Sequence, residues 1–253
     1  MINFSAIYTI IALKMKEIFQ EYHYSILAPL ITNLLFIIIF LTVENYYSLS
    51  INNYSFVQFI APGLILMIVA QESYFNTSAT LINMKQIGSL EDWLMAPIFR
   101  VEILFSLVCS ALIIGIFLAI LNFIAFSFFL DLKIYNIFYF LYYLVIVIIF
   151  FSCVGCIIGI IFNTWDSQST FSNFFVSPIN FLSGTFFSIN YLPENYRFIL
   201  LYNPYYYVVS YFRDSFHQPF IFYKLENIFI LIFIFISIII TSFIFFKGYR
   251  VIK

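Results

Sequence analysis

Six long apolar runs constrain what this chain can fold into more than any other feature of its sequence. A helix needs about 20 apolar residues, or about 17 at minimum, to cross a hydrocarbon core of about 30 Å. The runs cover approximately residues 25–43, 56–74, 102–129, 137–162, 171–187 and 225–246. Each meets this length, although Ser, Asn and Pro residues interrupt the fifth. We therefore expect an all-α integral membrane protein with six transmembrane helices.

The composition leads to the same class of protein. Of the 253 residues, 64% are hydrophobic and only 9% are charged, too few to cover the surface of a soluble domain. The bilayer must therefore be the solvent. The net charge of -1 gives no indication of nucleic acid, and we expect no such partner. Because no period of about 20–50 residues recurs, residues 1–253 are expected to form a single membrane domain.

The first 24 residues differ from the six apolar runs. On a helical wheel with about 100° per residue, they separate into an apolar and a polar arc. The apolar arc holds Phe4, Ile7, Tyr8, Ile11, Met15, Ile18, Phe19 and Tyr22, and the polar arc holds Ser5, Thr9, Lys14, Lys16, Glu17, Gln20, Glu21 and His23. This pattern is typical of a helix in the membrane interface. We expect an interfacial amphipathic helix over residues 1–24, and the first five spans within residues 25–187.

The placement of Lys and Arg predicts the orientation in the membrane. With the N-terminus inside, the cytoplasmic segments carry seven basic residues, namely Lys14, Lys16, Lys85, Arg100, Lys247, Arg250 and Lys253. The outer segments carry four, namely Lys133, Arg197, Arg213 and Lys224. An even number of spans puts both termini on one side. Both termini are therefore expected in the cytoplasm, with the sixth span and a cytoplasmic tail in residues 225–253.

The link between the second and third runs contains a short helix of its own. Gly88 breaks the preceding helix, Ser89 and Asp92 have the spacing of a capped helix start, and Pro97 stops the new helix. The helix expected over residues 90–96 presents apolar and acidic side chains together: Leu90, Glu91, Asp92, Trp93 and Leu94. Two interpretations stay open. It is either an interfacial turn anchored by Trp93 in the headgroups, or a docking helix for a cytoplasmic partner.

Polar and helix-breaking residues in the runs identify a candidate translocation path. Glu72 is expected at the cytoplasmic end of the second span, where snorkelling or capping is the alternative to a transport role. Pro62 and Gly63 predict a kink or an unwound segment. The polar fifth run would line a polar passage or a subunit interface. The candidate path comprises Asn33, Pro62, Gly63, Glu72, Asn173, Ser177 and Asn180.

Two glycines four residues apart, Gly155 and Gly159, allow close approach between helices. The neighbouring helix can belong to the same chain or to a second copy, and packing within one chain is the more frequent case.

Motifs for covalent chemistry are missing from the sequence. No glycine begins a GxxxxGK[S/T] phosphate loop, and no serine stands in a GxSxG elbow. His23 and His217 have no carboxylate or cysteine partners at metal spacing, and Cys153 and Cys156 lie in an apolar run. We expect no catalytic residue, no metal site and no cofactor on this chain.

Residues 181–216 are too polar and too rich in proline for a spanning helix, yet too aromatic for a solvated loop. They contain Ser183-Gly184-Thr185-Phe186-Phe187, Leu192-Pro193, Asn203-Pro204 and Arg213. Together with Ala61-Pro62-Gly63 and Gly88-Ser89-Leu90-Glu91 followed by Pro97, these motifs resemble the permease subunit of type-2 ABC exporters. That family includes exporters of nodulation factors, polysaccharides, lipid-linked glycans and drugs. The resemblance covers most of the chain.

The resemblance implies a function for both polar regions. Residues 188–224 would form an external re-entrant region with two short helices. These helices would begin at the prolines, and the arginines of the region would reach the headgroups. It implies an outer gate at Gly184, Leu192, Pro193, Arg197, Asn203, Pro204 and Arg213. The coupling interface would comprise Gly88, Ser89, Leu90, Glu91, Asp92, Trp93, Leu94 and Pro97.

The resemblance also implies partners, location and substrate class. The partners would be a cytoplasmic ABC ATPase that carries ATP and Mg, a second permease copy that is identical or paralogous, and membrane lipid. The chain would lie in a bacterial inner membrane and export a lipidic, glycan-linked or amphipathic substrate without catalysing a covalent step. Two alternatives remain: a secondary transporter driven by an ion gradient, for which Glu72 is the candidate carboxylate, and a membrane enzyme or assembly factor.

Overall fold

The computed structural model describes residues 3–47, 50–51, 54–216 and 225–247, and almost all of them are helical. The first half of the chain forms α1 (Phe4–Gln20), the π-helical turn η1 (His23–Leu27), α2 (Ala28–Tyr47), a hairpin of β1 (Ser50–Ile51) and β2 (Tyr54–Ser55), α3 (Phe56–Ile87), α4 (Ser89–Met95) and α5 (Arg100–Ser127). The strands pair antiparallel, with Ser50 opposite Ser55 and Ile51 opposite Tyr54.

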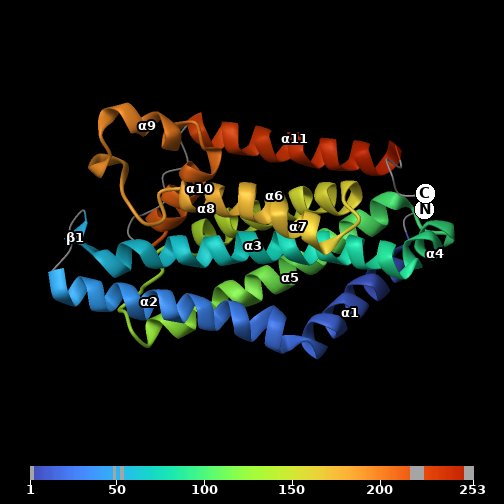
Figure 1. Ribbon diagram of the computed structural model, residues 1–253, viewed down its shortest axis with the longest axis horizontal. Helices are drawn as coiled ribbons and strands as arrows, with labels where there is room; N and C mark the ends of the chain where they lie inside the picture. The colour runs from blue at the N-terminus through green and yellow to red at the C-terminus, as the bar shows by residue number, and fades with distance from the viewer. Residues whose placement is uncertain (1–2, 48–49, 52–53, 217–224, 248–253) are drawn as a thin grey trace.

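The second half is equally helical. It forms α6 (Ile137–Ile161), α7 (Trp165–Phe171), the π-helical turn η2 (Ser172–Val176), α8 (Ser177–Phe181), the 3-10 turn η3 (Ile189–Tyr191), α9 (Glu194–Leu201), α10 (Pro204–Asp214) and α11 (Leu225–Lys247). The long helices run along the longest axis of the molecule (Figure 1). The β hairpin and α9 lie at one end, here called the hairpin end, and α4 lies at the other, here called the α4 end.

Five helical stretches within the described residues are long and apolar enough to cross a membrane. They are His23–Tyr47, Phe56–Ile87, Arg100–Ser127, Ile137–Ile161 and Asn227–Phe245. They correspond to five of the six apolar runs. The prediction of an all-helical membrane fold is thereby confirmed, while the count of six spans stays a prediction.

The remaining run, predicted to span the membrane over 171–187, forms a different helix from the one expected. The helical stretch starts at Trp165, passes through η2 and ends with α8 at Phe181. Its start is capped by the Thr164 hydroxyl, which accepts the Ser167 N–H at 3.3 Å. Gly184 then adopts a φ of 72°, which no helix continues through. The predicted bounds were wrong because these polar turn residues, and not hydropathy, set the ends.

The second span is also longer than predicted. With 32 residues, α3 is about 48 Å long at 1.5 Å per residue, well beyond the hydrocarbon thickness. It continues past the predicted end near residue 74 to Gly88, whose φ of 82° terminates it. Pro62 lies inside the continuous helix, so the expected unwound segment is not present in α3.

Close packing of α3 on α6 shows which helix Gly155 and Gly159 contact. A Cβ at Gly155 would lie 2.5 Å from the backbone oxygen of Tyr74, and one at Gly159 would lie 2.8 Å from Leu81 Cβ. The Thr77 hydroxyl donates across this contact to the Ser152 carbonyl at 3.1 Å. The glycines therefore bring together two helices of the same chain.

The expected amphipathic helix is present as α1, but its faces point differently from the expectation. Ile10, Lys14 and Ile18 are buried against the bundle, whereas Phe4 is 77% exposed and Tyr8 is 75% exposed. Part of the apolar arc therefore faces outward, where lipid can cover it, while Ile18 of the same arc packs inward. Lys14, which the wheel placed on the polar arc, faces inward to a cavity shared with α3 and pairs there with Glu17.

A pair of glycine substitutions tests the α3–α6 contact. Gly155→Ala should lower the free energy of unfolding by about 1–3 kcal/mol, because its Cβ meets backbone that cannot move aside. Gly115→Ala is the matched control, since the nearest atoms to its Cβ would all belong to side chains, namely Ile148 Cδ1 at 2.8 Å, Ile148 Cγ1 at 2.9 Å and Ser73 Oγ at 3.5 Å. Both replacements gain the same helix propensity. Thermal unfolding in one detergent compares them, and equal melting points would contradict the packing.

Candidate functional site

Two short helices, α9 and α10, lie toward the hairpin end and, with their N-cap residues, carry most of the residues for which the resemblance implies an outer gate. Pro204 is the first residue of α10, where its missing N–H has no helical partner to lose. Pro193 immediately precedes α9 as its N-cap residue. The chain thus begins both helices where the two prolines predicted them.

Asn203 holds α10 to the end of α8. Its Oδ1 accepts the Tyr205 N–H at 3.0 Å and so caps the first turn of α10. Its Nδ2 donates to the carbonyls of Leu182 at 2.9 Å and Ile179 at 3.3 Å, which lack helical partners at the end of α8. One side chain therefore completes two helix ends.

Arg213 does not reach toward headgroups, as the sequence suggested, but points into the bundle. Its Nε donates to the Phe59 carbonyl on α3 at 2.9 Å, and its Nη2 donates to the Gly184 carbonyl at 2.9 Å. Its guanidinium carbon lies 3.7 Å from the centroid of the Phe59 ring. A planar cation with several fixed donors suits two carbonyls from different segments. Arg213 thus ties α10 to α3 and to the turn at Gly184.

Two glycines make room for this arrangement. A Cβ at Gly63 would lie 2.7 Å from Thr185 Cγ2, so only glycine lets the turn at residues 183–187 rest on α3. Gly184 has a φ of 72°, and a Cβ there would also lie 3.0 Å from the Tyr206 ring. Arg197, in contrast, lies at the surface. Its Nε donates to the Leu192 carbonyl at 3.1 Å, and its Nη1 lies 3.9 Å from Glu194 Oε1.

The structure does not bring the candidate path residues together. Asn33 is buried and joins helices, because its Nδ2 donates to the Leu64 carbonyl at 3.2 Å and to Asn122 Oδ1 at 3.0 Å. Asn173 is exposed and Ser177 half-buried. Asn180 is fully buried, and neither polar atom of its amide has a hydrogen-bond partner among the described residues. Pro62 and Gly63 are both buried within α3.

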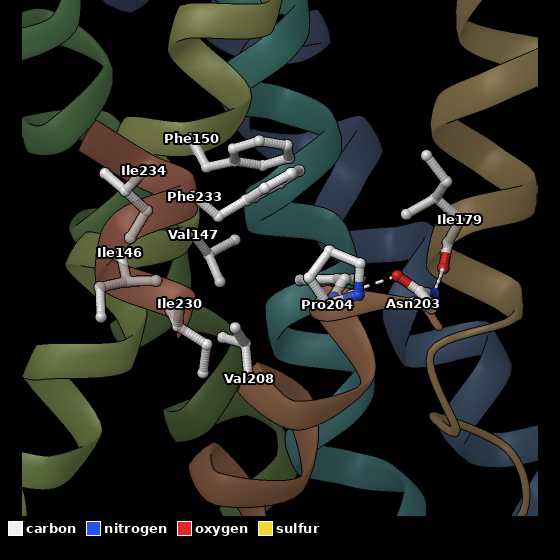
Figure 2. Close-up of a pocket in the computed structure, with 11 residues that line it drawn as sticks. Ile146, Val147, Phe150, Ile179, Asn203, Pro204, Val208, Ile230, Phe233 and Ile234 are labelled. Carbon is white, nitrogen blue, oxygen red and sulfur yellow. Dashed lines mark hydrogen bonds between the residues drawn. The ribbon is translucent and has the colours of Figure 1, made fainter. Parts of the chain in front are cut away.

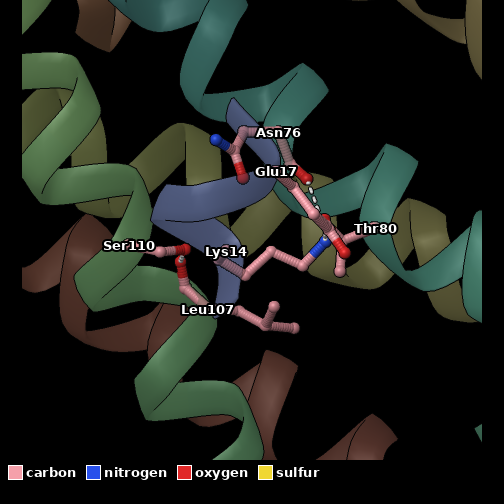
Figure 3. A network of polar contacts seen from close by, with 6 residues as sticks. All are labelled: Lys14, Glu17, Asn76, Thr80, Leu107 and Ser110. Carbon is pink, nitrogen blue, oxygen red and sulfur yellow. Dashed lines mark hydrogen bonds and ion pairs between the residues drawn. The ribbon is translucent and has the colours of Figure 1, made fainter. Parts of the chain in front are cut away.

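Glu72 lies in the middle of α3 and not at its end, and it faces a charged cavity. The cavity has a volume of about 100 Å³ and lies between α1, α3 and α5. Lys14, Glu17 and Glu21 of α1 line it beside Glu72. Figure 3 shows Lys14 reaching from α1 toward α3, with Glu17, Asn76 and Thr80 around it. The helical wheel did not show that Lys14 faces inward, although the spacing of three residues between Lys14 and Glu17 predicts an ion pair.

The predicted helix after Gly88 is present as α4, but two of its details were wrong. Ser89 makes no helix cap, because its hydroxyl points back to the Met84 carbonyl at 3.5 Å and Gly88 occupies the cap position. Leu90 is 3% exposed and lies in a buried cluster, against which Trp93 packs. That cluster also contains Ile10 of α1, Ile103 and Leu104 of α5, and Phe245 of α11.

The outward face of α4 is acidic, with apolar residues beside it. Glu91 and Asp92 are exposed, Met95 is 82% exposed, and Ile87, just before Gly88, is 72% exposed. We call these four residues the α4 face. Beyond α4, the backbone of Ala96 turns to a ψ of 151° ahead of Pro97, as a residue before proline must. The side chain of Leu94 lies outside the described residues.

Hydrogen bonds fix the segments before and after α4. Lys85, near the end of α3, donates to the carbonyls of Ile160 and Phe162 and to Asn163 Oδ1, and so caps the end of α6. At the start of α5, Glu102 Oε2 accepts the Phe99 N–H at 2.9 Å and Oε1 accepts the Asn3 N–H at 2.6 Å. The end of α3 is therefore tied to α6, and the start of α5 is tied to the start of α1.

Removing the guanidinium groups of the two gate arginines should have unequal effects. Arg213→Met leaves two carbonyls without their charged donor and should cost about 2 kcal/mol or more of unfolding free energy. Arg197→Met removes an exposed side chain and should stay within about 0.5 kcal/mol. Thermal unfolding of the two variants in parallel measures the difference. Equal losses of unfolding free energy would show that Arg213 does not hold α10 to α3 and to the turn at Gly184.

Comparison with known proteins gives one consistent result. The sequence profile of the family described as "ABC-2 type transporter" matches residues 5–217. The inner membrane transport permease YadH of Escherichia coli strain K12 is 28% identical over 192 residues, which cover 76% of this chain and 75% of that protein. Proteins of the same name from Escherichia coli O157:H7 and Shigella flexneri give the same figures. The chain therefore belongs to the ABC-2 type transporter family and is an integral membrane permease.

Proposed function

We propose that this chain is the transmembrane subunit of an ATP-driven ABC exporter and that the α4 face is where a separate ATPase docks. The observation that carries the proposal is the geometry of α4. It is a short helix at the very end of the bundle, anchored by the buried Leu90, with an exposed acidic and apolar face. Membership of the ABC-2 family supports the same partner.

The residues of the α4 face define which side chains the docking surface of the ATPase must present. Glu91 and Asp92 call for basic side chains, and Met95 and Ile87 call for an apolar pocket between them. Leu90 and Trp93, which the resemblance placed in the coupling interface, both pack on the permease itself. ATP and Mg would bind to the ATPase.

The route from α4 to the outer gate runs through α3. One continuous helix begins beside Arg213 at the hairpin end and ends at Gly88, where α4 starts. A push on α4 that moves α3 along or about its axis would therefore displace Phe59 and the turn at Gly184 from Arg213. Ties from Glu102 to Asn3 and Phe99 would carry the same movement to α1.

Substrate export would need a second copy of the permease, identical or paralogous, with the passage opening between the two. The substrate class we propose is lipidic, glycan-linked or amphipathic, because exposed aromatic side chains cover the gate helix α9, including Tyr196 and Phe198. Location in a bacterial inner membrane is supported by the similarity to YadH. The α4 end would face the cytoplasm.

A secondary transporter remains the second candidate because of one observation, the charged cavity that contains Glu72. An ion-driven carrier needs a carboxylate that loads and releases a cation within the membrane. Transport that runs on an ion gradient without any ATPase, and that Glu72→Gln abolishes, would favour this candidate.

Charge reversal on the α4 face tests the docking proposal. The double variant Glu91→Lys/Asp92→Lys should lose co-purification of the partner ATPase, because like charges across an interface cost several kcal/mol. Transport in vesicles should fall with it. Glu194→Lys, on the exposed α9, is the matched control and should keep co-purification. Unchanged ATPase recovery with the double variant would refute docking at this face.

Cysteine labelling tests the orientation. With Cys109, Cys153 and Cys156 replaced by Ala, single cysteines are placed at Met95 and Tyr202, which are 82% and 85% exposed at opposite ends. An impermeant maleimide added to intact cells should label position 202, and position 95 only after the cells are opened. The reverse pattern would place the α4 end outside.

A further inference from the structure

A cavity of about 140 Å³ lies between α6, α8, α10 and α11, toward the hairpin end. Figure 2 shows α10 starting at Asn203 and Pro204, with Ile179 of α8 on one side and the side chains of α6 and α11 on the other. The cavity thus lies beside the first turns of α10, next to two of the spans. Neither the family membership nor the proposed docking of an ATPase involves this cavity.

Its walls offer almost no polar atom to a ligand. From α6 come Ile146, Val147 and Phe150, from α11 Ile230, Phe233 and Ile234, and from α10 Val208. Two side chains in the wall carry polar groups, Asn203 and Tyr205. Asn203 already bonds Ile179, Leu182 and the Tyr205 N–H. The Tyr205 hydroxyl is buried without a hydrogen-bond partner among the described residues, and one such group is too few to hold a water. Water needs about two to four polar partners, and an apolar cavity of about this size stays dry and accepts apolar guests.

The exposure of the lining residues shows where a guest would enter. Val147, Val208 and Ile230 are at most 5% exposed and form the floor. Phe233 is 42% exposed and Ile179 is 38% exposed, and these two lie at the rim. The outer surface of α11 beside the rim is apolar as well, with Phe229 70% exposed. Because α6 and α11 are both long enough to cross the membrane, the medium at this surface is lipid hydrocarbon.

We propose that this cavity binds an alkyl chain of a membrane lipid, inserted between the gate helix α10 and the spans α6 and α11. Alkyl chains are what the bilayer presents at the rim, and the dry apolar floor matches their chemistry. An empty cavity forfeits the dispersion contacts of its walls, and a chain restores them. A bound chain therefore fastens α10 to α6 and α11 and steadies the gate in the observed position. This role requires neither the ATPase nor a direction of transport.

Photocrosslinking on the full chain tests the proposal. The purified permease is placed in nanodiscs of phosphatidylethanolamine and phosphatidylglycerol that contain a phosphatidylglycerol with a diazirine on one acyl chain. Adducts are then mapped to single residues by mass spectrometry. We expect adducts on the floor residues Val147, Val208 and Ile230, in addition to the general labelling of exposed surface. A probe with the diazirine on its headgroup should leave these residues unlabelled.

Filling the cavity supplies the matched comparison. Ile230→Phe adds volume inside the cavity, whereas Ile232→Phe makes the same change on a side chain of α11 that is 50% exposed and outside the lining. Floor adducts at Val147 and Val208 should be lost in the first variant and kept in the second. Val208→Phe fills the same space from α10 and should remove the adducts at Val147.

Each outcome decides the proposal. Wild-type adducts confined to outward residues such as Phe229 and Ile232, with none on the floor, would overturn it whether or not a filled variant folds. Floor adducts that survive both filling substitutions would overturn it too. The assay contains no ATPase and no transport step. An absence of floor adducts would therefore leave the proposed exporter function unaffected, and a failure of the exporter proposal would leave the lipid site unaffected.

Discussion

The close contact between α3 and α6 supports the rest of the molecule. Gly155 and Gly159 let α6 approach so near that an added Cβ would meet the backbone of Tyr74. In a bilayer, helices gain little from hydrophobic burial, so small residues and short hydrogen bonds such as that from Thr77 to Ser152 hold them together. The remaining elements assemble around this pair. The gate helix α10 buries Val209 and Phe212 in the core cluster that α3 and α6 share.

The length of α3 connects two distant regions of the molecule. The helix has 32 residues, and Pro62 does not interrupt it. At one end it meets α4 through Gly88, and at the other it offers the Phe59 carbonyl to Arg213. Under the proposed function, a movement of α4 would reach the turn at Gly184 through this one helix. The glycine at position 63 allows the gate turn to rest directly on it.

Much of the fold followed from the sequence because hydropathy and helix-stop residues act locally. Five spans, the short helix after Gly88 and the two helices near Pro193 and Pro204 were all predicted near their observed places. Predictions failed where a distant partner decides. Lys14 turns inward to a cavity shared with α3, and Arg213 bonds carbonyls from two other segments. Leu90 fills a cluster made by five other helices, α1, α3, α5, α6 and α11. A helical wheel or a sequence motif includes only residues close in the chain, so neither contains these distant partners.

The sequence by itself determined that the chain is a helical membrane protein, because runs of apolar residues long enough to cross lipid favour membrane-spanning helices. It also placed the breaks between helices, since proline and glycine act on their own backbone. Only the tertiary structure decided which face of each helix is buried. In this chain lipid-facing and protein-facing side chains are both apolar, so the hydrophobic pattern does not distinguish them. The α4 face, the inward Arg213 and the cavity beside α10 all depend on that choice, which is made by packing between helices far apart in the chain.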